Sequence, residues 1–168
     1  MASYSYSIMT TLYSQTTSNT SSAFNWNANT DNYAWSFVPS VSGTPWTLTL
    51  NVTSITGTPT CDFWIKADKT AASATHWIAS WVTLSAGDNV ITLTSGALLT
   101  AWVTYWVYMW RTSSTLNVPS ISYDTWKANY TVYRSTSSWV DPATLWFSND
   151  IRMTLTSTPN TGGFFMFF

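Results

Sequence analysis

The chain has 168 residues, of which only 8% are charged, and its formal net charge is −1. Twelve Trp, nine Tyr and eight Phe stand in a background rich in Ser and Thr. This much aromatic surface can build a hydrophobic core, which excludes a disordered chain, and the absence of a basic run argues against nucleic-acid binding.

The N-terminal stretch "MASYSYSIMTT" has no basic region, apolar region or cleavage site, so it contains no recognisable signal peptide. Tyr4, Tyr6 and Ile8 share one face of an extended segment, and a polar Ser/Thr/Asn tract follows them. Residues 1–22 are expected to be an extended arm that docks on a neighbouring subunit. The alternative is that they form the first strand of the fold itself.

The middle of the chain alternates strand-like runs with turn residues. In "TPWTLTLNVTSI", Trp46, Leu48, Leu50 and Val52 alternate with polar residues, and "GTP" at 57–59 ends the run. "CDFWIKAD", "HWIASWVTL", "VITLTS", "ANYTVYRS" and "NDIRMTLTS" follow at similar spacing. Period-2 patterns separated by Gly, Pro, Asn and Asp predict antiparallel strands.

The uncharged stretch "LLTAWVTYWVYMW", residues 98–110, is the most unusual segment. As a helix it would be about 20 Å long, too short for a bilayer core of about 30 Å, so membrane insertion is not expected. As a strand it would carry Trp102, Trp106, Tyr108 and Trp110 on one face and aliphatic residues on the other. Its Val, Thr, Tyr and Trp content favours one long strand.

The C-terminal stretch "GGFFMFF" is a glycine pair followed by five apolar residues. Residues 158–168 are expected to be a tail in which Phe164, Phe165, Phe167 and Phe168 dock on a neighbouring subunit, since an extended apolar segment readily adds to a sheet edge. The alternative is a last strand of the fold.

Together these patterns predict an all-β protein. We expect an antiparallel β-sandwich, jelly-roll-like, with about 8–10 strands in residues 23–157 and extended segments on both sides of it.

The order of motifs resembles a family of β-sandwich modules of secreted bacterial surface proteins and tailed-phage structural proteins. The stretches that carry the resemblance are "SFVPS" (36–40), "GTPTCDFWIKAD" (57–68), "LSAGDNVITL" (84–93), "LTAWVTYW" (99–106) and "SSWVDPATLWFSNDIRMTL" (137–155). They extend over about three-quarters of the chain. The resemblance implies a non-enzymatic extracellular or virion module and supplies no catalytic residues.

Two positions depart from the pattern of that family. Cys61 stands where the "GTPTG"-like turn has its second glycine, and Trp102 stands where the "LTAGTTYW"-like phrase has glycine. Because glycine often marks a bend, we expect Trp102 to straighten its strand and to extend the aromatic face.

The sequence contains no convincing enzyme site. Glu is absent, so a two-carboxylate site would need two of the seven Asp, and His76 is the single histidine, with no G-x-S-x-G motif in the chain. One Cys and one His cannot form a Cys/His metal cluster, and no cofactor or metal is expected. Calcium binding by turn Asp residues is left open.

The aromatic residues therefore carry the functional interpretation. Core packing, a subunit interface and a platform for stacking sugars are the competing uses. The candidates for an interface or a glycan platform are Trp102, Trp106, Tyr108, Trp110 and Trp139.

The sequence favours a structural protein of a virion or extracellular filament: a capsid, decoration or fibre subunit. Its partners would be copies of itself or other subunits, and a host-adhesion surface that binds cell-surface glycans remains open. Low charge suits such interfaces, because unpaired ions are costly to desolvate. The alternative is a secreted carbohydrate-binding module with a Trp/Tyr platform.

Overall fold

The computed structural model describes residues 6–16, 23–25, 32–69, 75–94, 96–112, 118–124, 132–135, 144–147, 150–158 and 160–162. Within this part of the chain all regular elements are β-strands, and every pairing is antiparallel. The described residues contain no helix of the length and apolar character needed to cross a membrane.

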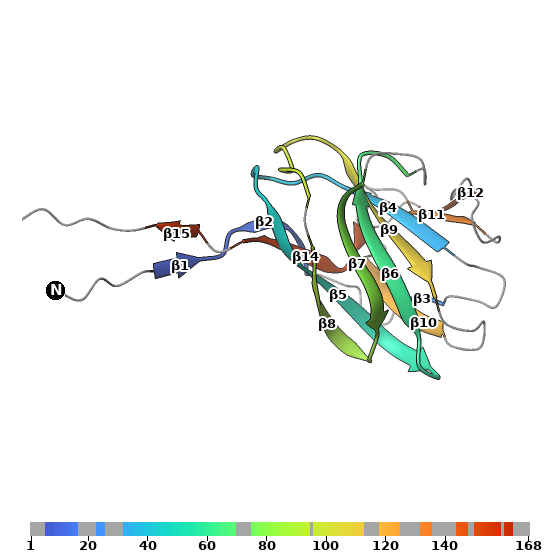
Figure 1. Cartoon of the computed structure of the whole chain (residues 1–168). Coiled ribbons are helices and arrows are strands. Elements are labelled where there is room, and N and C mark those ends of the chain that lie inside the picture. Colours follow the sequence, from blue (N-terminus) through green and yellow to red (C-terminus); the bar gives the residue numbers. More distant parts are fainter. Residues whose placement is uncertain are drawn as a thin grey trace, which may run out of the picture.

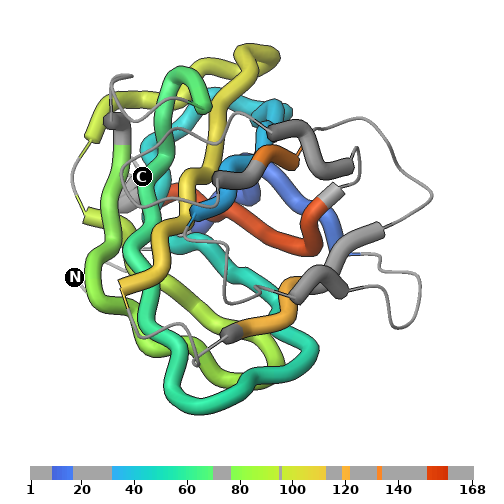
Figure 2. The backbone as a smooth tube through the Cα atoms, turned by 90° about the vertical axis from the view of Figure 1, so that its right-hand side faces the viewer, coloured from blue at the N-terminus to red at the C-terminus, as the bar shows by residue number. Residues whose placement is uncertain are grey.

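Two sheets form the body of the molecule (Figures 1 and 2). The six-stranded sheet has the order β12-β11-β4-β9-β6-β7. Its strands are β12 (Thr144–Phe147), β11 (Val132–Ser135), β4 (Asn32–Phe37), β9 (Tyr105–Arg111), β6 (Thr60–Lys66) and β7 (Thr75–Thr83).

The seven-stranded sheet has the order β13-β10-β5-β14-β2, and β3 pairs with β10 and β8 with β5. Its strands are β13 (Asp150–Ile151), β10 (Val118–Asp124), β5 (Pro45–Thr56), β14 (Met153–Ser157), β2 (Thr11–Gln15), β3 (Ala23–Asn25) and β8 (Gly87–Thr92). A separate two-stranded ribbon pairs β1 (Tyr6–Ile8) with β15 (Asn160–Gly162).

The core lies between the two sheets and is built by alternating residues. Leu48, Leu50 and Val52 of β5 are buried, as the period-2 pattern predicts, and the polar residues between them lie on the outer face. Trp46, which belongs to the same alternating set, is 42% exposed instead. Ring contact between Tyr13 of β2 and Phe37 of β4, with centroids 5.6 Å apart, joins the sheets across the core. The prediction of an all-β antiparallel sandwich is confirmed, and the jelly-roll-like connectivity stays a prediction.

Residues 98–110 do not form one long strand. β9 begins only at Tyr105, and its inward residues Tyr105, Val107 and Met109 are buried as expected. Trp102 precedes the strand in a turn, with φ 65°. This left-handed conformation is incompatible with an extended strand, so Trp102 does not straighten the segment, and it is not part of the face formed by Trp106, Tyr108 and Trp110.

The N-terminal segment also differs from the expected arm of residues 1–22. β2, which lies inside that range, is a strand of the sandwich, because Leu12 and Tyr13 are buried in the core. β1 and β15 pair with each other outside the body, in register from Tyr6 opposite Gly162 to Ile8 opposite Asn160. Figure 1 shows this ribbon standing away from the sandwich.

Candidate functional site

An aromatic face covers the outer side of the six-stranded sheet. It consists of Trp64, Trp106, Tyr108, Trp110 and Tyr133, which alternate with inward-facing residues of β6, β9 and β11. Strand register places Trp64 directly opposite Tyr108, and Ala34 of β4 separates Tyr108 from Tyr133. Sequence alternation found the three β9 residues, but only the register between strands reveals that Trp64 and Tyr133 join them.

The rings of the aromatic face pack edge to face. The Trp64 ring lies 5.7 Å from Tyr108 and 6.1 Å from Trp110, at interplanar angles of 79° and 62°. Trp106 and Tyr133 are 5.7 Å apart at 64°. These are favourable geometries for aromatic pairs, so the rings stabilise one another. Tyr108 is 1% exposed although it points away from the core, so it supports the face without displaying a free surface.

Two lysines add positive charge to the aromatic face. The Nζ of Lys66 lies 5.7 Å from the centroid of Tyr108, and the Nζ of Lys69 lies 4.7 Å from Tyr133 and 5.9 Å from Trp106. Both are within the range of cation–π attraction. Neither lysine was expected from the sequence: Lys66 ends β6 two residues after Trp64 and so shares its face, and Lys69 lies in the bend that follows β6.

A second apolar surface lies at one end of the sandwich. We call it the apolar end, and it consists of five exposed residues in three segments: Met9, Val41, Leu98, Trp102 and Val103. Hydrogen bonds tie these segments together. The Ser40 N–H donates to the Leu12 carbonyl at 2.9 Å, and Gly43 and Leu99 exchange two backbone hydrogen bonds of 3.0 and 2.9 Å.

The terminal ribbon, formed by β1 and β15, begins at this same end. The Thr10 N–H donates to Ser157 Oγ at 3.0 Å, and the Thr158 N–H donates to the carbonyl of Thr44 at 2.9 Å. These bonds place the base of the ribbon beside the segment that carries Val41. The apolar end and the ribbon therefore form one continuous region of the molecule.

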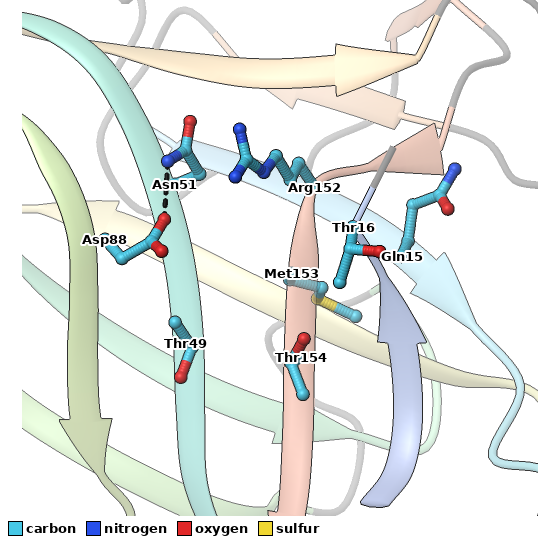
Figure 3. Close-up of a pocket in the computed structure, with 8 residues that line it drawn as sticks. All are labelled: Gln15, Thr16, Thr49, Asn51, Asp88, Arg152, Met153 and Thr154. Carbon is cyan, nitrogen blue, oxygen red and sulfur yellow. Dashed lines mark hydrogen bonds between the residues drawn. The ribbon is translucent and has the colours of Figure 1, made fainter. Parts of the chain in front are cut away.

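A shallow groove crosses the outer side of the seven-stranded sheet (Figure 3). The Asn51 amide donates to the Asp88 carboxylate at 2.5 Å, and Arg152 lies beside them. The groove is lined by Gln15, Thr16, Thr49, Asn51, Asp88, Arg152, Met153 and Thr154. Its volume is about 60 Å³, whereas pockets for small molecules usually measure about 300–1,000 Å³.

The described titratable residues considered for chemistry are spread over both sheets, and Asp124 and Asp150 lie opposite each other where β10 pairs with β13. Asp62 lies on the six-stranded sheet and accepts a hydrogen bond from the Trp81 N–H. Asp88 lies on the seven-stranded sheet and accepts one from the Asn51 side-chain amide. His76 lies in β7. In the part of the chain that the structure describes, no three His, Cys, Asp or Glu side chains are grouped as a metal would require.

Cys61 is a buried free thiol, fully enclosed in the core. Burial raises the pKa of the Cys61 thiol well above its usual range, and the nearby Arg111 guanidinium opposes this only in part. A thiol that stays protonated is a poor nucleophile. Cys61 therefore acts as a packing residue.

The structure separates the predicted site residues. It brings Trp106, Tyr108 and Trp110 together on the aromatic face and places Trp102 at the apolar end. Tyr6 and Ile8 lie in β1 of the ribbon. The remaining candidates lie outside the described residues: Tyr4, Trp139, Phe164, Phe165, Phe167 and Phe168.

Comparison with known proteins gives no relative. No family model, no curated protein and no solved structure matches this chain.

Proposed function

We propose that the chain is a non-enzymatic structural protein of a virion or extracellular filament, which assembles through its apolar end and the segments that flank the sandwich. The observation that carries the proposal is the terminal ribbon. β1 and β15 pair only with each other within the described residues, so each has one backbone edge available. Isolated two-stranded ribbons are marginally stable in water, and an open strand edge is a template for another strand.

The surface beside the ribbon supports the same proposal. Trp102 is 78% exposed and Leu98 58% exposed, next to Met9, Val41 and Val103. Clustered apolar residues at the surface of a soluble protein commonly mark an interaction site. With only 8% charged residues in the chain, such an interface can be buried with few ions to desolvate.

The carbohydrate-binding alternative would rest on the aromatic face. Trp64, Trp106 and Trp110 are all partly exposed there. Stacking on a sugar requires an accessible flat ring or several nearly parallel ones, whereas Trp64 and Trp110 are inclined at 62°. The edge-to-face arrangement favours mutual packing, so we place assembly first and glycan binding, as part of host adhesion, second.

The test is the solution mass of the purified chain by light scattering over a range of concentrations. We expect a discrete oligomer or polymer, and a shift towards monomer when residues 163–168 are deleted. Circular dichroism should show unchanged β-structure in the shortened chain. A full-length chain that stays monomeric at every concentration would overturn self-assembly, and glycan-array binding would then test the alternative.

A further inference from the structure

Trp102 combines two unfavourable features in one residue. Its side chain is 78% exposed, the largest exposure among the described large hydrophobic residues, and its backbone φ is 65°. A bulky residue in the left-handed region is a conformational outlier, whereas glycine occupies it freely. Strain of this kind is often found at functional sites. Trp81 shares both features, so the place of Trp102 at the apolar end, beside the terminal ribbon, is what distinguishes it.

The loop that carries Trp102 is held by a dense set of hydrogen bonds. The Trp102 N–H donates to the carbonyl of Pro39 at 3.0 Å, and the Ala101 N–H donates to Ser42 Oγ at 2.8 Å. The N–H of Thr100 donates to the Tyr105 hydroxyl at 3.0 Å. An indole displayed on a pre-organised loop loses little conformational entropy on binding, and Trp is among the residues most enriched at binding hot spots.

The ribbon places Gly162, the last described residue, away from the sandwich (Figure 1). Asn160 pairs with Ile8 near the sandwich, and Gly162 pairs with Tyr6 farther out, so β15 runs away from the body (Figure 1). Residues 163–168, "GFFMFF", follow directly and carry no charge. Because Gly162 lies at the outer end of the ribbon, a segment attached to it is better placed to reach the apolar end of another molecule than the apolar end of its own.

We infer that residues 163–168 of one copy pack on the apolar end of a second copy, with Trp102 as the central contact. This inference rests on the proposed self-assembly and names its two contacting surfaces. Phe and Met side chains suit the site, because aromatic rings pack edge to face on an indole and a thioether contacts ring edges favourably. Burying Trp102 in the assembly also accounts for its exposure in the single chain.

The first experiment compares Trp102→Gly with Trp81→Gly in the full chain. Trp81 is a matched control, since it is 72% exposed and has φ 57°. In Figure 1 the loop between β8 and β9 lies at the top of the sandwich, whereas β7, which carries Trp81, ends at the bottom. Glycine suits both backbone conformations, so both variants should fold.

We expect Trp102→Gly to raise the concentration at which half of the chains are assembled by about tenfold or more, as for a hot-spot residue. Trp81→Gly should leave that concentration unchanged. Equal assembly of Trp102→Gly and the unchanged protein would overturn the inference while leaving self-assembly intact. If the full-length protein without substitutions is monomeric at every concentration, the proposed function itself is overturned.

The second experiment identifies the occupant. A photoreactive benzoylphenylalanine replaces Trp102 in full-length chains, and ¹⁵N-labelled and unlabelled copies are mixed before irradiation. Trypsin cleaves after Arg152, so residues 163–168 are recovered in the peptide 153–168. We expect cross-links between position 102 and residues 163–168 of a differently labelled copy, and none from the same probe at position 81. Cross-links from position 102 to any other segment, or only within one copy, would overturn the inference.

Discussion

The backbone N–H of Trp81 donates to Oδ1 of Asp62 over 2.7 Å, at a point where β7 has one residue more than its neighbour β6. Register runs from Cys61 opposite Val82 to Phe63 opposite Ala79, so Asp62 faces both Ser80 and Trp81. This is a β-bulge, and the carboxylate accepts a backbone hydrogen bond that the ladder itself does not satisfy. The bulge thereby holds Trp81 at φ 57°.

Substitution of Asp62 tests the importance of this bond. We expect Asp62→Ala to lower the free energy of unfolding by about 1 kcal/mol, because the Trp81 N–H loses its side-chain acceptor. Asp62→Asn keeps a side-chain oxygen and should lie closer to the original protein. Urea unfolding followed by fluorescence measures both variants. If Asp62→Ala and Asp62→Asn lower the free energy of unfolding equally, the hydrogen bond to the Trp81 N–H does not stabilise the bulge.

Backbone strain at Trp81 predicts an unusual order of substitutions. Alanine shares the steric restriction of tryptophan in the left-handed region and glycine does not, so Trp81→Gly should be more stable than Trp81→Ala by about 1 kcal/mol. At most strand positions a glycine variant is less stable than the corresponding alanine variant. Thermal unfolding of the two variants gives the difference directly. A more stable alanine variant would contradict the assignment of a positive φ to this residue.

The core and much of the strand content follow from local sequence, whereas the candidate sites depend on non-local geometry. Leu48, Leu50 and Val52 alternate with polar residues, and this pattern alone predicts their burial and the extended form of β5. The conformation of Trp102 depends on a hydrogen bond to Pro39, which lies 63 positions earlier in the chain (102 − 39 = 63). The residues around Trp102 in the sequence do not predict a contact with so distant a residue.

Pairing between distant strands explains the other differences. β1 and β15 lie at opposite ends of the described chain, so the ribbon cannot be found from either segment alone. Trp64 reaches the aromatic face through its register with Tyr108, and Tyr133 through its register with Ala34. Alternation correctly divides β9 into two faces, but it does not tell which neighbouring side chains complete them.

The two sheets are joined by a buried hydrogen bond between Trp35 and Met153. The Trp35 Nε1–H of β4 donates to the Met153 sulfur of β14 at 3.2 Å, and both residues are buried in the core. We expect Met153→Leu to destabilise the protein by about 1–3 kcal/mol, because leucine has a similar volume but leaves the indole N–H without this acceptor.

A double-mutant cycle separates this hydrogen bond from packing. In a Trp35→Phe background no indole N–H is present, so Met153→Leu should there cost clearly less than in the original protein. The free energies of unfolding of the four proteins, from urea titration, give the coupling. If Met153→Leu costs the same in both backgrounds, the sulfur contributes packing alone.

The buried thiol of Cys61 predicts a specific pH dependence of stability. In the unfolded chain a cysteine ionises near pH 8.5, whereas burial raises the pKa of Cys61 in the folded protein. Above about pH 8.5 the folded state therefore binds more protons than the unfolded state. This contribution to stability is complete below that pH and is lost as the pH rises, by up to about 1.4 kcal/mol per pH unit.

The contribution of Cys61 can be isolated by comparing the protein with Cys61→Ala. Between pH 7 and pH 10 the original protein should lose more unfolding free energy than the variant, since the two proteins differ only in the Cys61 thiol. Iodoacetamide should label Cys61 only in urea, because the native thiol is fully enclosed and protonated. Rapid labelling of the folded protein, or parallel pH profiles of the two proteins, would contradict a raised pKa and place the thiol within reach of solvent.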